Sequence, residues 1–289
     1  MDILGCLLEG KTCEAMNGEV EHSTHTMEEM AEAYRSNPDY KYSRVEEFVD
    51  NVTHRTPSSI GNQNGVCGRF VGVCTESTKL QKLIKKMKKM TPECKLTSLL
   101  AGIFCMAYKK ACQKHDVSDI SLDSFQIYVP VSIREKLGIR NSQMGVYSPI
   151  FVCRIDEELN NGSIWAIAEK MSKQIHQRIK SNEDFEALNQ MDETIRLVES
   201  DSFKTRQITD LTLSNICVMN NTTNEAIKAK EHYFCIPAIE GRFLPAILLG
   251  LTTVDGNLCW AVSYDEKVYK TGFFDDVKDE IVSLVDQLV

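Results

Sequence analysis

The sequence predicts an α/β protein of the layered α+β kind, and three observations support this fold class. Segments with the helical spacing of apolar residues are mixed with short strand-like segments along the whole chain. Hydrophobic residues make up 43% and charged residues 26% of the 289 residues, as in ordinary globular proteins and unlike disordered ones. No internal repeat is apparent in the sequence. A layered packing of helices on sheet is therefore expected.

The first 66 residues are expected to form a helix followed by a crossover segment. Apolar residues take helical spacing from residue 3 onward, and Gly18 is the expected stop. Short helical patterns follow at Thr26–Ser36 and Ser43–Val49, and Asn51–Gly65 has the composition of a loop. Because a helix is already under way at Met1, the sequence indicates that the natural chain begins further upstream.

Residues 67–289 have a more regular pattern of helices. Thr75–Thr78 caps a basic helix that has an apolar stripe on one face, and the Thr91-Pro92 break ends it. The remaining helices are recognised by apolar residues at intervals of three and four. They are expected at Leu96–His115, Ser163–Ile179, Glu183–Val198 and Phe273–Leu288.

Strands are expected where short apolar and β-branched runs are bounded by turn residues. Asp255-Gly256 is a common signal for a tight hairpin between the last two strands. The expected strands are Arg69–Cys74, Ser124–Val131, Gly145–Ile155, Leu211–Met219, His232–Ile236, Ala246–Val254 and Leu258–Asp265.

Composition argues against several classes of protein. The net charge of −8 is unfavourable for a nucleic-acid-binding protein. The 11 cysteines include no CxxC pair, so a structural zinc site is not expected, and reduced core thiols in a cytoplasmic protein are favoured over disulfides. The sequence predicts no metal site, no signal peptide and no transmembrane segment.

Several stretches, in order, resemble the C-terminal part of the condensation/alcohol-acetyltransferase family, whose fold is like that of chloramphenicol acetyltransferase. Lys95–Ala101 resembles the start of the helix after the family's crossover, and Val129–Arg134 resembles its P-V-x-x-R strand end. Leu213–Ile216 resembles its S-N-hydrophobic-G strand, with Cys217 in place of the usual glycine. Leu258–Asp265 and the helix after it resemble the family's final strand, Tyr-Asp and helix.

The resemblance implies both a fold and a reaction. Residues 67–289 would be the C-terminal lobe of a two-lobed, chloramphenicol acetyltransferase-like acyltransferase, preceded in residues 1–66 by the helix that follows the HHxxxD motif and by the crossover segment. The reaction would transfer an acyl group from CoA or a carrier-protein thioester to a small-molecule alcohol or amine. No bound cofactor is implied, because acyl-CoA or the acyl carrier is itself a co-substrate.

The family's general base is the second histidine of HHxxxD, and this sequence contains no such motif. Met1–Gly5 resembles the end of the motif, which would place both histidines upstream of Met1. The resemblance also implies a structural ion pair between Asp2 and Arg134. Three hypotheses follow. The chain as given is inactive and belongs to a longer acyltransferase, or it is a non-catalytic binding protein (pseudoenzyme) derived from the family, or it is a different enzyme that uses its own histidines.

Four groups of polar residues are candidates for function, each with a simpler alternative. Ser214 and Asn215 could contact an oxyanion or thioester, or could satisfy backbone groups at a strand end, and both interpretations stay open. The pair His22 and His25 could bind a metal or act as a displaced base, but a solvated loop is favoured. For the basic helix Lys79–Lys89, binding of CoA phosphates, an acidic membrane or a partner competes with a solvated face, which is favoured. Acids at Phe273–Asp276 fit the first turn of a helix better than a metal site.

Overall fold

The computed structural model describes residues 68–115, 125–136, 148–155, 161–181, 211–219, 228–235, 247–266 and 271–289, with Glu183, Asp184, Ala187, Arg196 and Tyr269. The elements expected in residues 1–66 lie outside the described residues, so the division near residue 66 stays a prediction. Most of the helix expected at Glu183–Val198 also lies outside them. Those of its residues that are described are helical.

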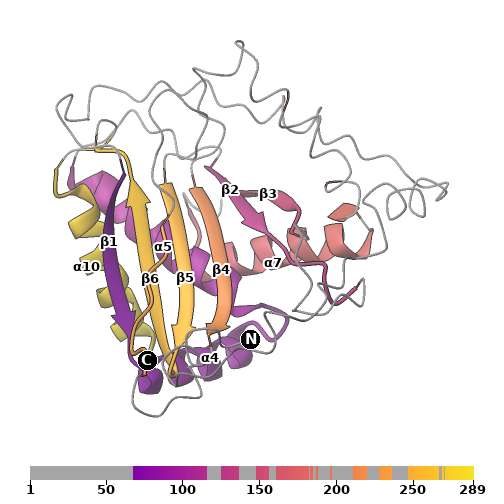
Figure 1. The fold of residues 1–289 in the computed structure, drawn as a ribbon, viewed down its shortest axis with the longest axis horizontal. Coiled ribbons are helices and arrows are strands. Elements are labelled where there is room, and N and C mark those ends of the chain that lie inside the picture. Colours follow the sequence, from indigo (N-terminus) through magenta and orange to yellow (C-terminus); the bar gives the residue numbers. More distant parts are fainter. Residues whose placement is uncertain are drawn as a thin grey trace, which may run out of the picture.

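A mixed sheet of six strands, in the order β1-β6-β5-β4-β2-β3, is the framework of the described part of the chain (Figure 1). Its centre is parallel where β4 pairs with β2 and with β5, and its other pairings are antiparallel. The strands are β1 (Arg69–Thr75), β2 (Phe125–Pro130), β3 (Ile150–Ile155), β4 (Leu211–Met219), β5 (Ile247–Val254) and β6 (Asn257–Tyr264).

Helices cover one face of this sheet (Figure 1). In α5 (Leu96–Lys114), residues around most of the circumference are buried, because α7 (Ile164–Lys180) packs on one side of it and α10 (Phe273–Leu288) on the other. The contact with α7 is close: a Cβ added at Gly102 would stand 2.6 Å from the carbonyl oxygen of Ile164. The fourth helix, α4 (Ser77–Met90), lies at the end of the sheet where β4 and β5 finish (Figure 1).

The core lies between the sheet and these helices and is rich in aromatic side chains. Trp260 on β6 is fully buried, and its indole N–H donates a hydrogen bond of 3.1 Å to the hydroxyl of Thr75 on β1. Tyr108 of α5 lies among the rings of Phe125, Tyr269 and Phe273. These contacts join the sheet to α5 and α10, so the last helix is an integral part of the core.

Most of the predicted elements are confirmed within two residues of their expected ends. The Asp255-Gly256 turn is confirmed as well: the two residues have φ of 50° and 79°, and Val254 pairs with Asn257 across a two-residue hairpin. β3 begins at Ile150, later than the expected Gly145, but residues 141–147 lie outside the described residues.

The strand expected at His232–Ile236 is wrong for the residues that are described. Residues 228–235 form neither a strand nor a helix. Their apolar and aromatic run serves another purpose, because Tyr233 packs on Gly72 of β1 and Phe234 packs on Gly250 of β5. A segment that crosses a sheet face has the same composition as a strand within the sheet, and the sequence pattern does not distinguish the two.

Candidate functional site

β2 and β4 form a fork at the centre of the sheet. They are paired only at Ile127 with Leu211 and at Tyr128 with Thr212. Pro130 ends β2 and has no N–H to donate, which helps to explain why the pairing stops. Among the described strands, β4 therefore has β5 as its one neighbour from Leu213 onward.

Asn215 lies in this fork and is held by the start of α5. Its side-chain amide donates a hydrogen bond of 2.9 Å to the hydroxyl oxygen of Thr97. Leu211 and Leu213, at the alternate positions before it, are buried in the helix-side core, so Asn215 points to the same side. The Thr97 oxygen accepts the hydrogen bond from Asn215, so the Thr97 O–H points away from Asn215. The hydroxyl is therefore able to donate a hydrogen bond to a carbonyl oxygen.

Ser214 points to the opposite face of β4, since successive side chains alternate in a strand. Ser214 is half-buried and pairs with Gly250 of β5. Across the sheet, Gly250 pairs with Ala261 of β6, and Ala261 pairs with Gly72 of β1. Ser214 and Asn215 are thus placed on opposite faces of the sheet. The role of each in contacting an oxyanion or thioester stays a prediction.

The row of small side chains on this outer face makes room for the segment that crosses it. Tyr233 lies over Gly72, and the carbonyl oxygen and ring of Phe234 lie over Gly250. The Tyr233 hydroxyl donates to Glu231 at 2.8 Å, and the pKa of Tyr233 is raised by burial first and then by this hydrogen bond. The sequence pattern alone does not predict this arrangement. Glycines in neighbouring strands were the available signal, but their alignment requires the strand register.

Replacing Gly250 with alanine is expected to lower the free energy of unfolding by about 1–3 kcal/mol, the usual range for overpacking. The added Cβ would stand 2.4 Å from the Phe234 carbonyl oxygen, which is backbone and cannot turn aside. Gly72→Ala is the matched control and should cost less, because its Cβ would meet the movable ring of Tyr233 at 3.1 Å. Urea denaturation measures both. Equal or reversed costs would contradict the close crossing at Phe234.

The end of β4 leaves large apolar side chains exposed beside the fork. Ile216, Val218 and Met219 are 45%, 66% and 39% exposed. The pairing of β4 with β5 shifts between Asn215 and Val218, so the strand is irregular at this point. An apolar surface next to polar hydrogen-bonding groups is suited to binding a ligand with both kinds of chemistry.

The other residues singled out in the sequence are placed as follows. Arg134 is half-buried in the turn after β2, while Asp2, His22 and His25 lie outside the described residues, so the Asp2–Arg134 ion pair stays a prediction. Cys94, Cys112 and Cys259 are buried free thiols, and burial raises the pKa of Cys112 to about 12. A search of the described residues finds no group of side chains that could hold a metal ion.

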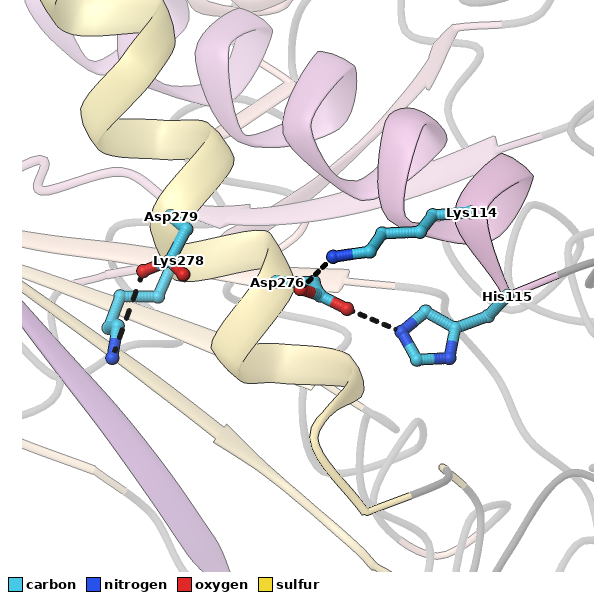
Figure 2. A network of polar contacts seen from close by, with 5 residues as sticks. All are labelled: Lys114, His115, Asp276, Lys278 and Asp279. Carbon is cyan, nitrogen blue, oxygen red and sulfur yellow. Dashed lines mark hydrogen bonds and ion pairs between the residues drawn. The ribbon is translucent and has the colours of Figure 1, made fainter.

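The acids expected in the first turn of the last helix are found there, and Asp276 forms a network with the end of α5 (Figure 2). Its carboxylate accepts hydrogen bonds from Lys114 at 2.5 Å and from His115 at 2.7 Å. These two hydrogen bonds hold the pKa of Asp276 below its usual value, and the one from Lys114 contributes most. The network fastens α5 to α10, so we assign it to the stability of the fold.

Asp276→Asn is expected to reduce the steepness with which acid destabilises the protein. Because the folded-state pKa of Asp276 is lowered, its stabilisation is present above the unfolded value of about 3.9 and is lost as pH falls through the folded value. Thermal unfolding from neutral pH to about pH 3 should show the two proteins converging in acid. Asp279→Asn, on the exposed side of α10, is the control and should track the wild type. A constant gap between Asp276→Asn and wild type would contradict the assignment.

No protein-family model matches the chain, and no curated protein matches it in sequence. Solved structures do match its fold. TRI3 trichothecene 15-O-acetyltransferase from Fusarium sporotrichioides has a TM-score of 0.60 at 12% identity, over 93% of this chain and 55% of that one. The first condensation domain of the CDA synthetase has a TM-score of 0.56 at 13% identity, over 99% of this chain and 57% of that one. The epimerization domain from the third module of tyrocidine synthetase B has a TM-score of 0.55 at 10% identity, over 92% of this chain and 56% of that one.

These matches define the fold class: the chain has the α/β fold of condensation domains and chloramphenicol acetyltransferase-like proteins, as the sequence predicted. It spans little more than half the length of these proteins. That it corresponds to their C-terminal part stays a prediction. In the part of the chain that the structure describes, no helix has the length and apolar character needed to cross a membrane.

Proposed function

We propose that the protein built on this fold transfers an acyl group from a thioester, carried by CoA or by a carrier protein, to a small-molecule alcohol or amine. The observation that carries the proposal is the fold, which this chain shares with an O-acetyltransferase and with domains of peptide synthetases. Fold alone does not fix chemistry, so an acyltransferase also needs groups that can act on a thioester. The fork between β2 and β4 supplies them.

In this proposal the fork binds the thioester end of the donor. The Thr97 hydroxyl donates a hydrogen bond to the carbonyl oxygen of the thioester, and Asn215 holds Thr97 in the required orientation. The exposed side chains of Ile216, Val218 and Met219 contact the apolar part of an acyl donor or acceptor that extends from the fork around the edge of β4. Ser214, on the opposite face, contributes a hydrogen bond only if the substrate extends around the edge of β4.

A general base is the missing component. The 289-residue sequence contains no HHxxxD motif and no two adjacent histidines. We therefore propose that the chain as given binds a thioester without turning it over. This absence also favours a second candidate function, that of a non-catalytic binding protein derived from an acyltransferase. Loss of a catalytic histidine commonly costs several orders of magnitude in rate.

The test uses the whole 289-residue chain with acetyl-CoA and with an acetylated phosphopantetheine. Calorimetry measures binding, and mass spectrometry with a panel of alcohols and amines detects acyl products. We expect binding without product, and Thr97→Val should weaken it about three- to tenfold, the value of one hydrogen bond. The matched control Thr78→Val, an exposed threonine in α4, should bind like the wild type.

Each remaining outcome is decisive. Failure of both thioesters to bind would overturn the proposed site. Product formation would overturn the proposed inactivity and support a working acyltransferase whose base lies elsewhere in this chain. Equal effects of Thr97→Val and Thr78→Val would remove Thr97 from the site.

A further inference from the structure

Helix α4 carries a dense row of lysines on its solvent side. Its apolar stripe, Leu80, Leu83 and Met87, is buried against the core, as the sequence predicted. The opposite side exposes Lys82, Lys85, Lys86, Lys88 and Lys89, which we call the lysine face.

Among the described residues, the lysine face has no acidic partners of the kind that several other lysines have. Lys79, at the start of the same helix, pairs with Asp286 at 2.5 Å, and Lys110 pairs with Glu280 at 2.8 Å. In the described part of the chain, by contrast, no ion pair is found for the lysine face. Acids outnumber basic residues by 41 to 33 in the sequence, so the concentration of unneutralised positive charge here is local.

This arrangement has an energetic cost that a partner would relieve. Members of the lysine face are spaced three and four residues apart, so their like charges lie next to each other on the helix surface. Each such pair destabilises a helix by about 0.2–0.5 kcal/mol. The cost is reduced when an anionic surface approaches, which favours association and guides the partner's orientation.

We propose that the lysine face is a docking surface for an acidic protein partner, one that presents a helix or loop rich in Asp and Glu. A membrane-binding amphipathic helix inserts its apolar side, but that side of α4 is occupied by the core. A nucleic acid is the other polyanion that such a face could meet, and a DNA duplex is therefore a competing probe in the test. Met90, 51% exposed at the end of α4, offers the single apolar contact that protein interfaces commonly use beside a charged rim.

The test measures fluorescence anisotropy of a labelled, glutamate-rich helical peptide titrated with the whole chain. Phosphatidylcholine–phosphatidylserine vesicles and a DNA duplex are the competing probes. We expect the peptide to bind and to be released by raising salt to about 0.5 M, where screening is strong. The variant Lys85→Glu/Lys86→Glu should weaken peptide binding roughly tenfold, because the charge reversal converts attraction into repulsion.

The matched control is Lys173→Glu/Lys180→Glu, which makes the same change in net charge at exposed positions of α7. It should bind the peptide within about twofold of wild type, since its charges lie outside the lysine face. Both double variants should stay folded at the assay temperature, and Lys85→Glu/Lys86→Glu should be at least as stable as the wild type, because it relieves like-charge repulsion on α4. Equal weakening by the two variants would overturn the proposal, as would binding of vesicles or DNA through α4 in preference to the peptide. Loss of thioester binding in the fork would leave this result unchanged, so the two proposals fail separately.

Discussion

Replacing Trp260 with alanine is expected to lower the free energy of unfolding by about 3–5 kcal/mol, the range for deleting a large aromatic side chain from a core. Trp260 lies on β6 between β1 and β5, and its side chain is fully buried. The substitution opens a cavity at the junction of the sheet and its helices. It also removes the hydrogen bond to Thr75, whose hydroxyl is itself buried.

Trp260→Phe is the control for the two contributions. It keeps most of the aromatic volume but removes the indole N–H, so it should cost much less than alanine and mainly report the hydrogen bond. Urea unfolding followed by circular dichroism measures both variants, because the substitution itself changes the tryptophan fluorescence. If alanine cost no more than phenylalanine, Trp260 would not be in the packed interior that the structure places it in.

Lys136→Met is expected to lower the free energy of unfolding by about 2–4 kcal/mol. Its ammonium group donates 2.6 Å to Asp184 and 2.9 Å to the carbonyl oxygen of Ile179 at the end of α7. The Asp184 side chain is only 1% exposed, so removing the positive charge leaves a carboxylate in a poorly solvated place. We place the cost slightly below the usual range of about 3–5 kcal/mol for breaking a buried pair, because the Lys136 side chain is 31% exposed.

The double variant Lys136→Met/Asp184→Asn separates the ion pair from general disruption. Asp184→Asn removes the buried negative charge that Lys136→Met leaves without its lysine. The double variant should therefore be more stable than Lys136→Met alone. A double-mutant cycle by urea denaturation gives the coupling energy. Additive losses would show that the two side chains do not interact across the turn after β2.

The sequence predicted local structure well where periodicity and turn chemistry act alone. The stripe of Leu80, Leu83 and Met87 in α4 is fixed by helical spacing, and the hairpin at Asp255-Gly256 is fixed by the low cost of positive φ at those residue types. The resemblance to the condensation and acetyltransferase class also predicted the fold that the structure has. Each of these features depends on residues close together in the chain, or on the order of such segments.

Partnerships between distant segments could not be predicted in this way. Asn215 was a candidate from its strand motif, but its bond to Thr97 joins residues far apart in the sequence. The strand expected at His232–Ile236 failed because a crossing segment and a paired strand have the same apolar composition. Only the register that aligns Gly72 with Gly250 through Ala261 shows why Tyr233 and Phe234 fit there.

The sequence by itself thus determined the fold class, most helices and strands, the buried stripe of α4 and the absence of an HHxxxD motif. Tertiary structure alone decided that β2 and β4 separate and that Asn215 meets Thr97. It also decided that Lys79 pairs with Asp286, while the described residues show no ion pair for the lysine face. The physical reason is the range of the interactions. Backbone periodicity acts over a few residues, whereas strand register and charge pairing depend on how the whole chain packs.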